Sequence, residues 1–152
     1  WASAHLEAAQ GSQALLSIRR HPDPDVRHAV AFGLGGVNRR DSIEALIELS
    51  KDVNDDVRNL ASFGLGTLCD EDSPEIRAAL VECLSDPVED VRDEALWGLA
   101  LRKDKVSLRL LLERIEEGNW TLGDEHAARG ATGSAPSASI VEVCAVLRRL
   151  LE

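Results

Sequence analysis

The sequence contains neither methionine nor tyrosine and has few other aromatic residues. Only 3% of its 152 residues are aromatic, so a packed interior has to be built from Leu, Ile, Val and Ala. It also lacks any apolar run of about eighteen residues, so we expect neither a membrane-spanning helix nor a membrane partner. Because the chain begins at Trp1 and has no Met, we interpret it as a piece of a longer protein.

Basic residues are scarce relative to acidic ones. The chain has 17 Lys and Arg against 27 Asp and Glu, which gives a net charge of −10. Nucleic-acid binding requires Lys and Arg side chains that neutralise phosphates, so this balance argues against a nucleic-acid partner. An acidic surface favours a basic protein as the partner.

Residues that could perform chemistry form no recognisable pattern. Cys69, Cys83 and Cys144 include no C-x-x-C pair, and we expect buried, reduced thiols in a cytoplasmic protein. The four histidines show no metal-ligand spacing, and no G-x-S-x-G, Walker or G-x-G-x-x-G motif is present. The sequence therefore predicts no catalytic residue, no metal ligand and no cofactor.

What the chain does contain is a repeated segment. "DVRHAVAFGLGG" at 25–36, "DVRNLASFGLGT" at 56–67 and "DVRDEALWGLAL" at 90–101 share Asp-Val-Arg, a small residue, an aromatic ring and Gly-Leu at fixed offsets. Their valines lie 31 and 34 residues apart. Each copy is preceded by a second segment, at 12–20, 42–50 and 75–85, whose apolar residues also recur with helical spacing. Each unit is therefore predicted to be a pair of helices.

The predicted organisation is a single array over 1–152. It comprises a partial unit at 1–9, full units at 10–38, 40–69, 73–102 and 104–133, and a capping helix at 137–152. In the fourth unit Asp124 replaces the repeated Val and Glu125 replaces the Arg. Asp23, Asn54 and Asp86 are the expected N-caps of the second helices.

One glycine occupies the same position in every copy, seven residues after the Val. Gly33, Gly64 and Gly98 fall on the buried side of the second helix. Glycine inside a helix costs about 1 kcal/mol relative to alanine. Recurrence at one position therefore predicts that the missing side chain lets neighbouring helices approach closely.

With these motifs, the chain resembles HEAT-repeat proteins, more narrowly the short HEAT-like repeats of phycobilisome lyases. It is also similar to bacterial HEAT-repeat proteins encoded beside Rhs-type toxin genes, some of which are proposed immunity partners. The resemblance implies an all-α fold, a right-handed α-α superhelix of four to five helical hairpins. It also implies that the second helices line a concave surface.

The repeated charged pair has two interpretations. The arginines could line an anion site, or they could form a structural ladder in which each pairs with an acidic residue at the start of a neighbouring helix. Residues repeated in every unit usually serve stacking, so we favour the ladder. Its predicted members are Asp25, Arg27, Asp56, Arg58, Asp90 and Arg92.

The side of the second helices opposite the buried stripe carries an aromatic row. Such a row could anchor an inserted peptide or helix, or each ring could pack sideways against the next repeat. Both interpretations are open. The candidate partner-binding residues are His28, Phe32, Asn59, Phe63, Asp93 and Trp97, with Trp1 in the same register.

These patterns favour a non-catalytic protein–protein interaction scaffold that binds a basic protein or peptide on its concave face. The similarity to HEAT-repeat proteins encoded beside Rhs-type toxin genes suggests that the partner is a toxin and that the chain is its immunity protein. The alternative is a bilin lyase-like HEAT-repeat enzyme or enzyme subunit. A net charge of −10 argues against it, because the open-chain tetrapyrrole ligand carries negatively charged propionates. A HEAT-like DNA glycosylase would need a basic groove.

Overall fold

The computed structural model describes residues 11–152, and all regular structure in this range is helical. The predicted partial unit at 1–9 and Trp1 lie outside the described residues. Residues 11–18 form the first described helix. The others are α2 (Pro24–Leu34), α3 (Arg40–Leu49), α4 (Asp55–Phe63), α5 (Pro74–Cys83), α6 (Glu89–Leu101), α7 (Lys105–Glu116), α8 (Leu122–Thr132) and α9 (Ile140–Leu151), with a π-helical turn, η1 (Gly64–Leu68), after α4.

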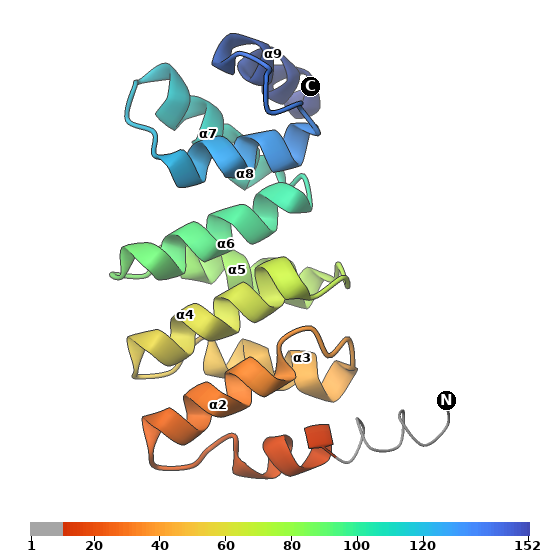
Figure 1. Ribbon diagram of the computed structural model, residues 1–152, viewed down its shortest axis with the longest axis vertical. Helices are drawn as coiled ribbons and strands as arrows, with labels where there is room; N and C mark the ends of the chain where they lie inside the picture. The colour runs from red at the N-terminus through yellow and green to blue at the C-terminus, as the bar shows by residue number, and fades with distance from the viewer. Residues whose placement is uncertain (1–10) are drawn as a thin grey trace.

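The helices stack in two layers, which makes the chain an α-solenoid. Figure 1 shows α2, α4, α6 and α8 one above another in a front layer, with α3, α5 and α7 behind them. Each front helix contacts the next one along the stack. At the C-terminal end α9 packs on α7 and α8 (Figure 1). The all-helical repeat architecture predicted from the spacing of the motifs is confirmed.

The second helices begin at polar residues in the preceding loops. The Asp23 side chain accepts a hydrogen bond from the Asp25 amide, and the Asn54 side chain accepts one from the Val57 amide, so both predicted N-caps are confirmed. The third prediction is wrong, because Val88 occupies the N-cap of α6. Asp86 lies two residues earlier and accepts a hydrogen bond from the Val88 amide at 2.9 Å.

The repeated apolar positions form the core. Leu34, Leu65 and Leu99, eight residues after the repeated Val, are all fully buried. One cluster of buried side chains extends from Leu16 to Leu99 across the first three units. A second cluster joins the end of α6 to α7, α8 and α9. No hairpin encloses a core of its own, so each unit depends on its neighbours for burial.

The repeated glycine is a point of close contact in two directions. Within each unit it lies against a leucine of the first helix, eighteen residues earlier: Leu15, Leu46 and Leu80 face Gly33, Gly64 and Gly98. Toward the preceding unit, a Cβ added to Gly98 would overlap Gly66 Cα, and one added to Gly66 would lie 3.0 Å from Gly98 Cα. The backbone of α6 therefore touches the backbone of η1.

The arginine ladder exists, but its carboxylates are not those of the Asp-Val-Arg motif. Arg27 donates to both carboxylate oxygens of Asp52 at 2.7 and 2.8 Å, and Arg58 donates to both of Asp86 at 2.7 and 3.1 Å. Both acceptors lie in the loop before the second helix of the next unit. Within residues 11–152, Arg92 donates only to its own loop, at the carbonyl oxygens of Asp86 and Pro87.

In the described part of the chain, the aspartates of the Asp-Val-Arg motif interact with their own helices and not with a neighbouring unit. Asp25, Asp56 and Asp90 are exposed in the first turns of α2, α4 and α6, where a negative charge interacts favourably with the helix dipole. Within residues 11–152 no ion pair is found for any of the three. They therefore act on their own helix, while the arginines connect one unit to the next.

A buried arginine that the repeat pattern did not single out holds η1 in place. The Arg102 side chain is only 7% exposed, and burial lowers the pKa of its guanidinium. It donates hydrogen bonds of 2.6–3.1 Å to the carbonyl oxygens of Leu65, Gly66, Cys69, Glu71 and Gly98. These bonds satisfy carbonyl groups at the end of the α4–η1 segment and fasten that segment to the end of α6.

Replacing Gly98 by Ala should lower the free energy of unfolding by about 2 kcal/mol, because the new methyl group forces α6 away from η1. Gly33→Ala is the matched control. Its Cβ would meet only a methyl group of Leu15, which can move, and alanine favours the helix. Urea unfolding followed by circular dichroism measures both variants. Equal effects of the two substitutions would contradict the backbone contact.

Replacing Asp86 by Asn should remove about 2 kcal/mol of stability at pH 7, because both members of the Arg58–Asp86 pair are largely buried. The hydrogen bonds from Arg58 lower the pKa of Asp86 below its usual value of 3.8. The stability that the pair contributes is thus complete above that value and is lost as the pH falls through the lowered pKa.

Urea unfolding of wild type and Asp86→Asn at several pH values should therefore show two curves that converge at low pH. The control is Asp90→Asn, an exposed aspartate on α6, whose loss should cost at most about 0.5 kcal/mol. A loss at Asp90 as large as that at Asp86 would mean that the ladder includes the motif aspartates after all.

Candidate functional site

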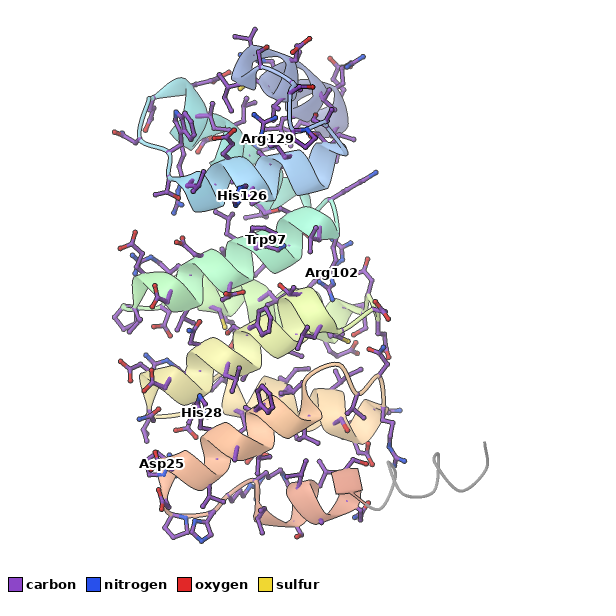
Figure 2. All side chains as sticks on the ribbon, viewed as in Figure 1. Asp25, His28, Trp97, Arg102, His126 and Arg129 are labelled. Carbon is purple, nitrogen blue, oxygen red and sulfur yellow. The ribbon has the colours of Figure 1, made fainter. Side chains whose placement is uncertain are left out.

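The residues of the predicted partner-binding row lie on successive helices of the front layer. His28 and Phe32 are on α2, Asn59 and Phe63 on α4, and Asp93 and Trp97 on α6. Figure 2 shows His28 near the lower end of this column and Trp97 further up, beside α8. We call the surface made by these six residues the front face.

The three rings of the row differ in exposure. Phe32 is 73% exposed, whereas Phe63 and Trp97 are half-buried. Trp97 packs against the buried cluster of α6, α7, α8 and α9. Its ring also meets the His126 ring of α8 edge to face, with centroids 6.1 Å apart and planes at 72° (Figure 2). The ring at one end of the row is thus free, and the ring at the other end is partly engaged in packing.

A hollow of about 160 Å³ lies beside Trp97, between α6 and α8. Its lining combines an aromatic ring, two apolar side chains and three carboxylates. The lining residues are Asp93, Glu94, Leu96, Trp97, Gly123, Asp124 and Ala127. We call it the α6–α8 hollow. Asp93 and Trp97 are predicted on this surface by the helical spacing, whereas their neighbours Glu94 and Asp124 are not predicted there.

The deepest carboxylate of the α6–α8 hollow is already paired. The Asp124 side chain is 1% exposed and accepts hydrogen bonds from Arg114 Nη1 at 2.8 Å and from the Thr121 amide at 2.9 Å. The same Arg114 nitrogen lies 4.0 Å from Asp93 Oδ1. The Arg114 guanidinium therefore lies near both carboxylates, closely to Asp124 and more distantly to Asp93.

The other two carboxylates are poorly compensated. Burial raises the pKa of Asp93, the charge of Asp124 raises it further, and Arg114 offsets only part of the shift. Burial also raises the pKa of Glu94, with further contributions from Asp93 and Asp90. Negative charge is thus held beside apolar surface with only partial compensation, which costs stability in the free protein.

A second, larger hollow of about 510 Å³ lies on the other layer, between α3 and α5. Ile43 and Ile47 contribute its apolar side chains. Arg40 and Glu44, which lie on its rim, pair with each other at 2.9 Å. It includes none of the predicted partner-binding residues.

Residues 11–152 offer no further cluster of reactive side chains. No group of three or more His, Cys, Asp and Glu side chains is placed to hold a metal ion there. No helix in this range has the length and apolar character that crossing a membrane requires. The three cysteines are unpaired and buried, as predicted. Burial raises the pKa of the Cys83 and Cys144 thiols, which makes them poor nucleophiles.

The sequence profile of the HEAT-repeat family matches residues 12–73 and 45–131. The chain belongs to the HEAT-repeat family. HEAT repeats commonly serve as scaffolds for protein interaction, and the family is generally non-enzymatic.

Among solved structures, this HEAT-repeat chain is similar to the crystal structure of YibA from Escherichia coli. The two share 28% sequence identity, and their superposition has a TM-score of 0.73. The alignment covers 96% of this chain and 55% of YibA, so the chain spans about half the length of that protein. No curated protein matches the chain.

Replacing Glu94 by Gln should raise the melting temperature at pH 7 by about 2 °C, because it removes an uncompensated charge from the α6–α8 hollow. Glu94 has a raised pKa in the folded state, so its ionised form destabilises the fold. That cost is complete at pH 7 and disappears as the pH falls through the raised pKa toward the usual value of 4.5.

Melting curves of wild type and Glu94→Gln should therefore converge as the pH approaches about 4. Glu113→Gln, on an exposed part of α7, is the control and should leave the melting temperature unchanged at either pH. If Glu94→Gln melts earlier than wild type at pH 7, the charge of Glu94 is compensated within the fold.

Proposed function

We propose that this HEAT-repeat protein is a non-catalytic scaffold that binds a basic protein partner on its front face, the expected concave surface of the array. The observation that carries the proposal is the exposure of Phe32 in the last turn of α2. An aromatic ring that is 73% exposed contributes little to the fold, and aromatic anchors of this kind dominate the energetics of protein interfaces.

The surroundings of Phe32 support an inserted partner rather than a flat contact. Gly33 and Gly36, which both follow Phe32, carry no side chain, and His28 one turn earlier is exposed. The row continues through half-buried Phe63 to Trp97. A helix or extended segment lying along the stack could therefore contact one ring in each of the first three full units.

Charge supports a basic partner. The chain carries −10 overall, and Asp93 and Glu94 add only partly compensated carboxylates to the front layer. Opposite charge across an interface increases the association rate and suppresses wrong partners. In the more specific form of the proposal the partner is a toxin domain and this chain is its immunity protein. That form is supported by the similarity of the repeats to HEAT-repeat proteins encoded beside Rhs-type toxins.

The test has two steps. Affinity purification from the host with mass spectrometry identifies a stoichiometric protein partner, and calorimetry with the purified partner measures its affinity. Phe32→Ser should weaken binding by at least about tenfold, with melting unchanged, because the ring anchors the partner and does not support the core.

The matched control is Val141→Ser on α9, a residue of nearly equal exposure, 71%, away from the row. It should leave the affinity unchanged. Equal affinities of wild type and Phe32→Ser would contradict the proposal. A copurifying open-chain tetrapyrrole, visible by its absorption, would favour the lyase-like alternative. For the immunity form, the partner should be toxic when expressed alone and harmless when coexpressed with this chain.

A further inference from the structure

We propose that the α6–α8 hollow receives an arginine side chain from the protein that binds the front face. The identity of the donor rests on the function proposed above, and the chemistry of the hollow stands on its own geometry. The volume of the hollow suits a single side chain. At about 160 Å³ the hollow is smaller than the roughly 300–1,000 Å³ typical of small-molecule sites and suits the head group of one side chain.

The walls of the hollow favour a flat cation. Trp97 supplies an indole ring, and Leu96 and Ala127 supply apolar surface. A guanidinium group stacks on aromatic faces and is less strongly hydrated than an ammonium group, so it loses less on entering such a space. The edge-to-face contact with His126 holds the Trp97 ring in a defined orientation before any partner arrives.

The carboxylates of the hollow are available to such a cation. Asp124 is occupied by Arg114 and Thr121, whereas Asp93 has only the long 4.0 Å approach of Arg114 and Glu94 has no ion pair in the described chain. The charged groups that act on Asp93 and Glu94 are Glu89, Asp90 and Arg92 of α6, Arg114 of α7 and Asp124 of α8. The carboxylates around the hollow thus outnumber the guanidinium groups of Arg92 and Arg114. An arginine side chain entering the hollow brings one further positive charge and can donate to two carboxylates at once.

The fourth unit departs from the repeat at Asp124, and this departure creates a site that the described residues of the first three full units do not have. Asp124 occupies the position filled by buried Val57 and Val91 in the earlier units. Its pairing with Arg114 brings charge into a place that is apolar elsewhere in the array. The hollow also borders Gly123, which adds no side chain to fill it.

The test uses the tripeptide acetyl-Gly-Arg-Gly-amide and its citrulline analogue, which has the same shape and no charge. Each is titrated at low salt into ¹⁵N-labelled protein, and the indole N–H signal of Trp97, assigned with Trp97→Phe, is followed. The arginine peptide should shift that signal saturably, and the citrulline peptide should bind at least about fivefold more weakly. Equal binding of the two peptides, or no shift at Trp97, would overturn the proposal.

A variant pair separates the site from general attraction to an acidic protein. Asp93→Asn with Glu94→Gln should weaken the arginine peptide by at least about fivefold, whereas Asp25→Asn with Asp56→Asn, which changes the net charge equally, should not. Equal losses in both double variants would also overturn it. Melting curves of both variants establish that each is folded.

The two proposals fail in different ways. If a partner binds and depends on Phe32 but is indifferent to Asp93→Asn with Glu94→Gln, the arginine site is wrong and the scaffold stands. If the peptide binds at Trp97 while no partner depends on Phe32, the arginine site stands and the front-face scaffold is wrong.

Discussion

The contact between Gly98 of α6 and Gly66 of η1 determines how closely two successive units can stack. At this point backbone meets backbone, and no side chain separates α6 from the preceding unit. The leucines that line the same interface, Leu65 and Leu99, are fully buried as a result. The repeated glycine is costly within an isolated helix, and the packing of neighbouring units compensates that cost. The front layer, and with it the front face, exists because these helices are close enough to form one surface.

Polar connections then hold the stack in register. Arg27 and Arg58 each reach a carboxylate in the next unit, while Arg102 joins α6 to the carbonyl groups of η1. These arginines are largely buried and hydrogen-bonded to several acceptors, so removing one partner leaves a buried charge or carbonyl group unsatisfied. The last pair of the ladder is Arg58–Asp86, because Arg92 donates to the carbonyl oxygens of its own loop. The contact between α6 and α8 is therefore made without an arginine of this ladder.

Buried charge and a cavity occur together at the contact between α6 and α8. In the first three units the second helices bury Val, Ala and Leu side chains, whereas the Asp124–Arg114 pair and a hollow beside Trp97 lie between α6 and α8. Asp93 and Glu94 destabilise the free protein there. Uncompensated charge of this kind is common where a protein binds something, because the ligand supplies the missing partner. Regular stacking provides the scaffold, and the irregular unit provides a chemically distinct site on it.

The sequence by itself determined the helical pairs, the HEAT-like architecture and the layer on which the aromatic row lies. These follow from spacing along one helix, and residues seven or eight apart on a helix share a face wherever the helix is placed. It did not determine which carboxylates the arginines bind, the π-helical turn held by Arg102, or the meeting of Glu94 with Asp124. Those depend on distances between segments about 25–37 residues apart, which local periodicity does not encode. Only the packing of one unit on the next decided them, because close contact between units brings those segments together.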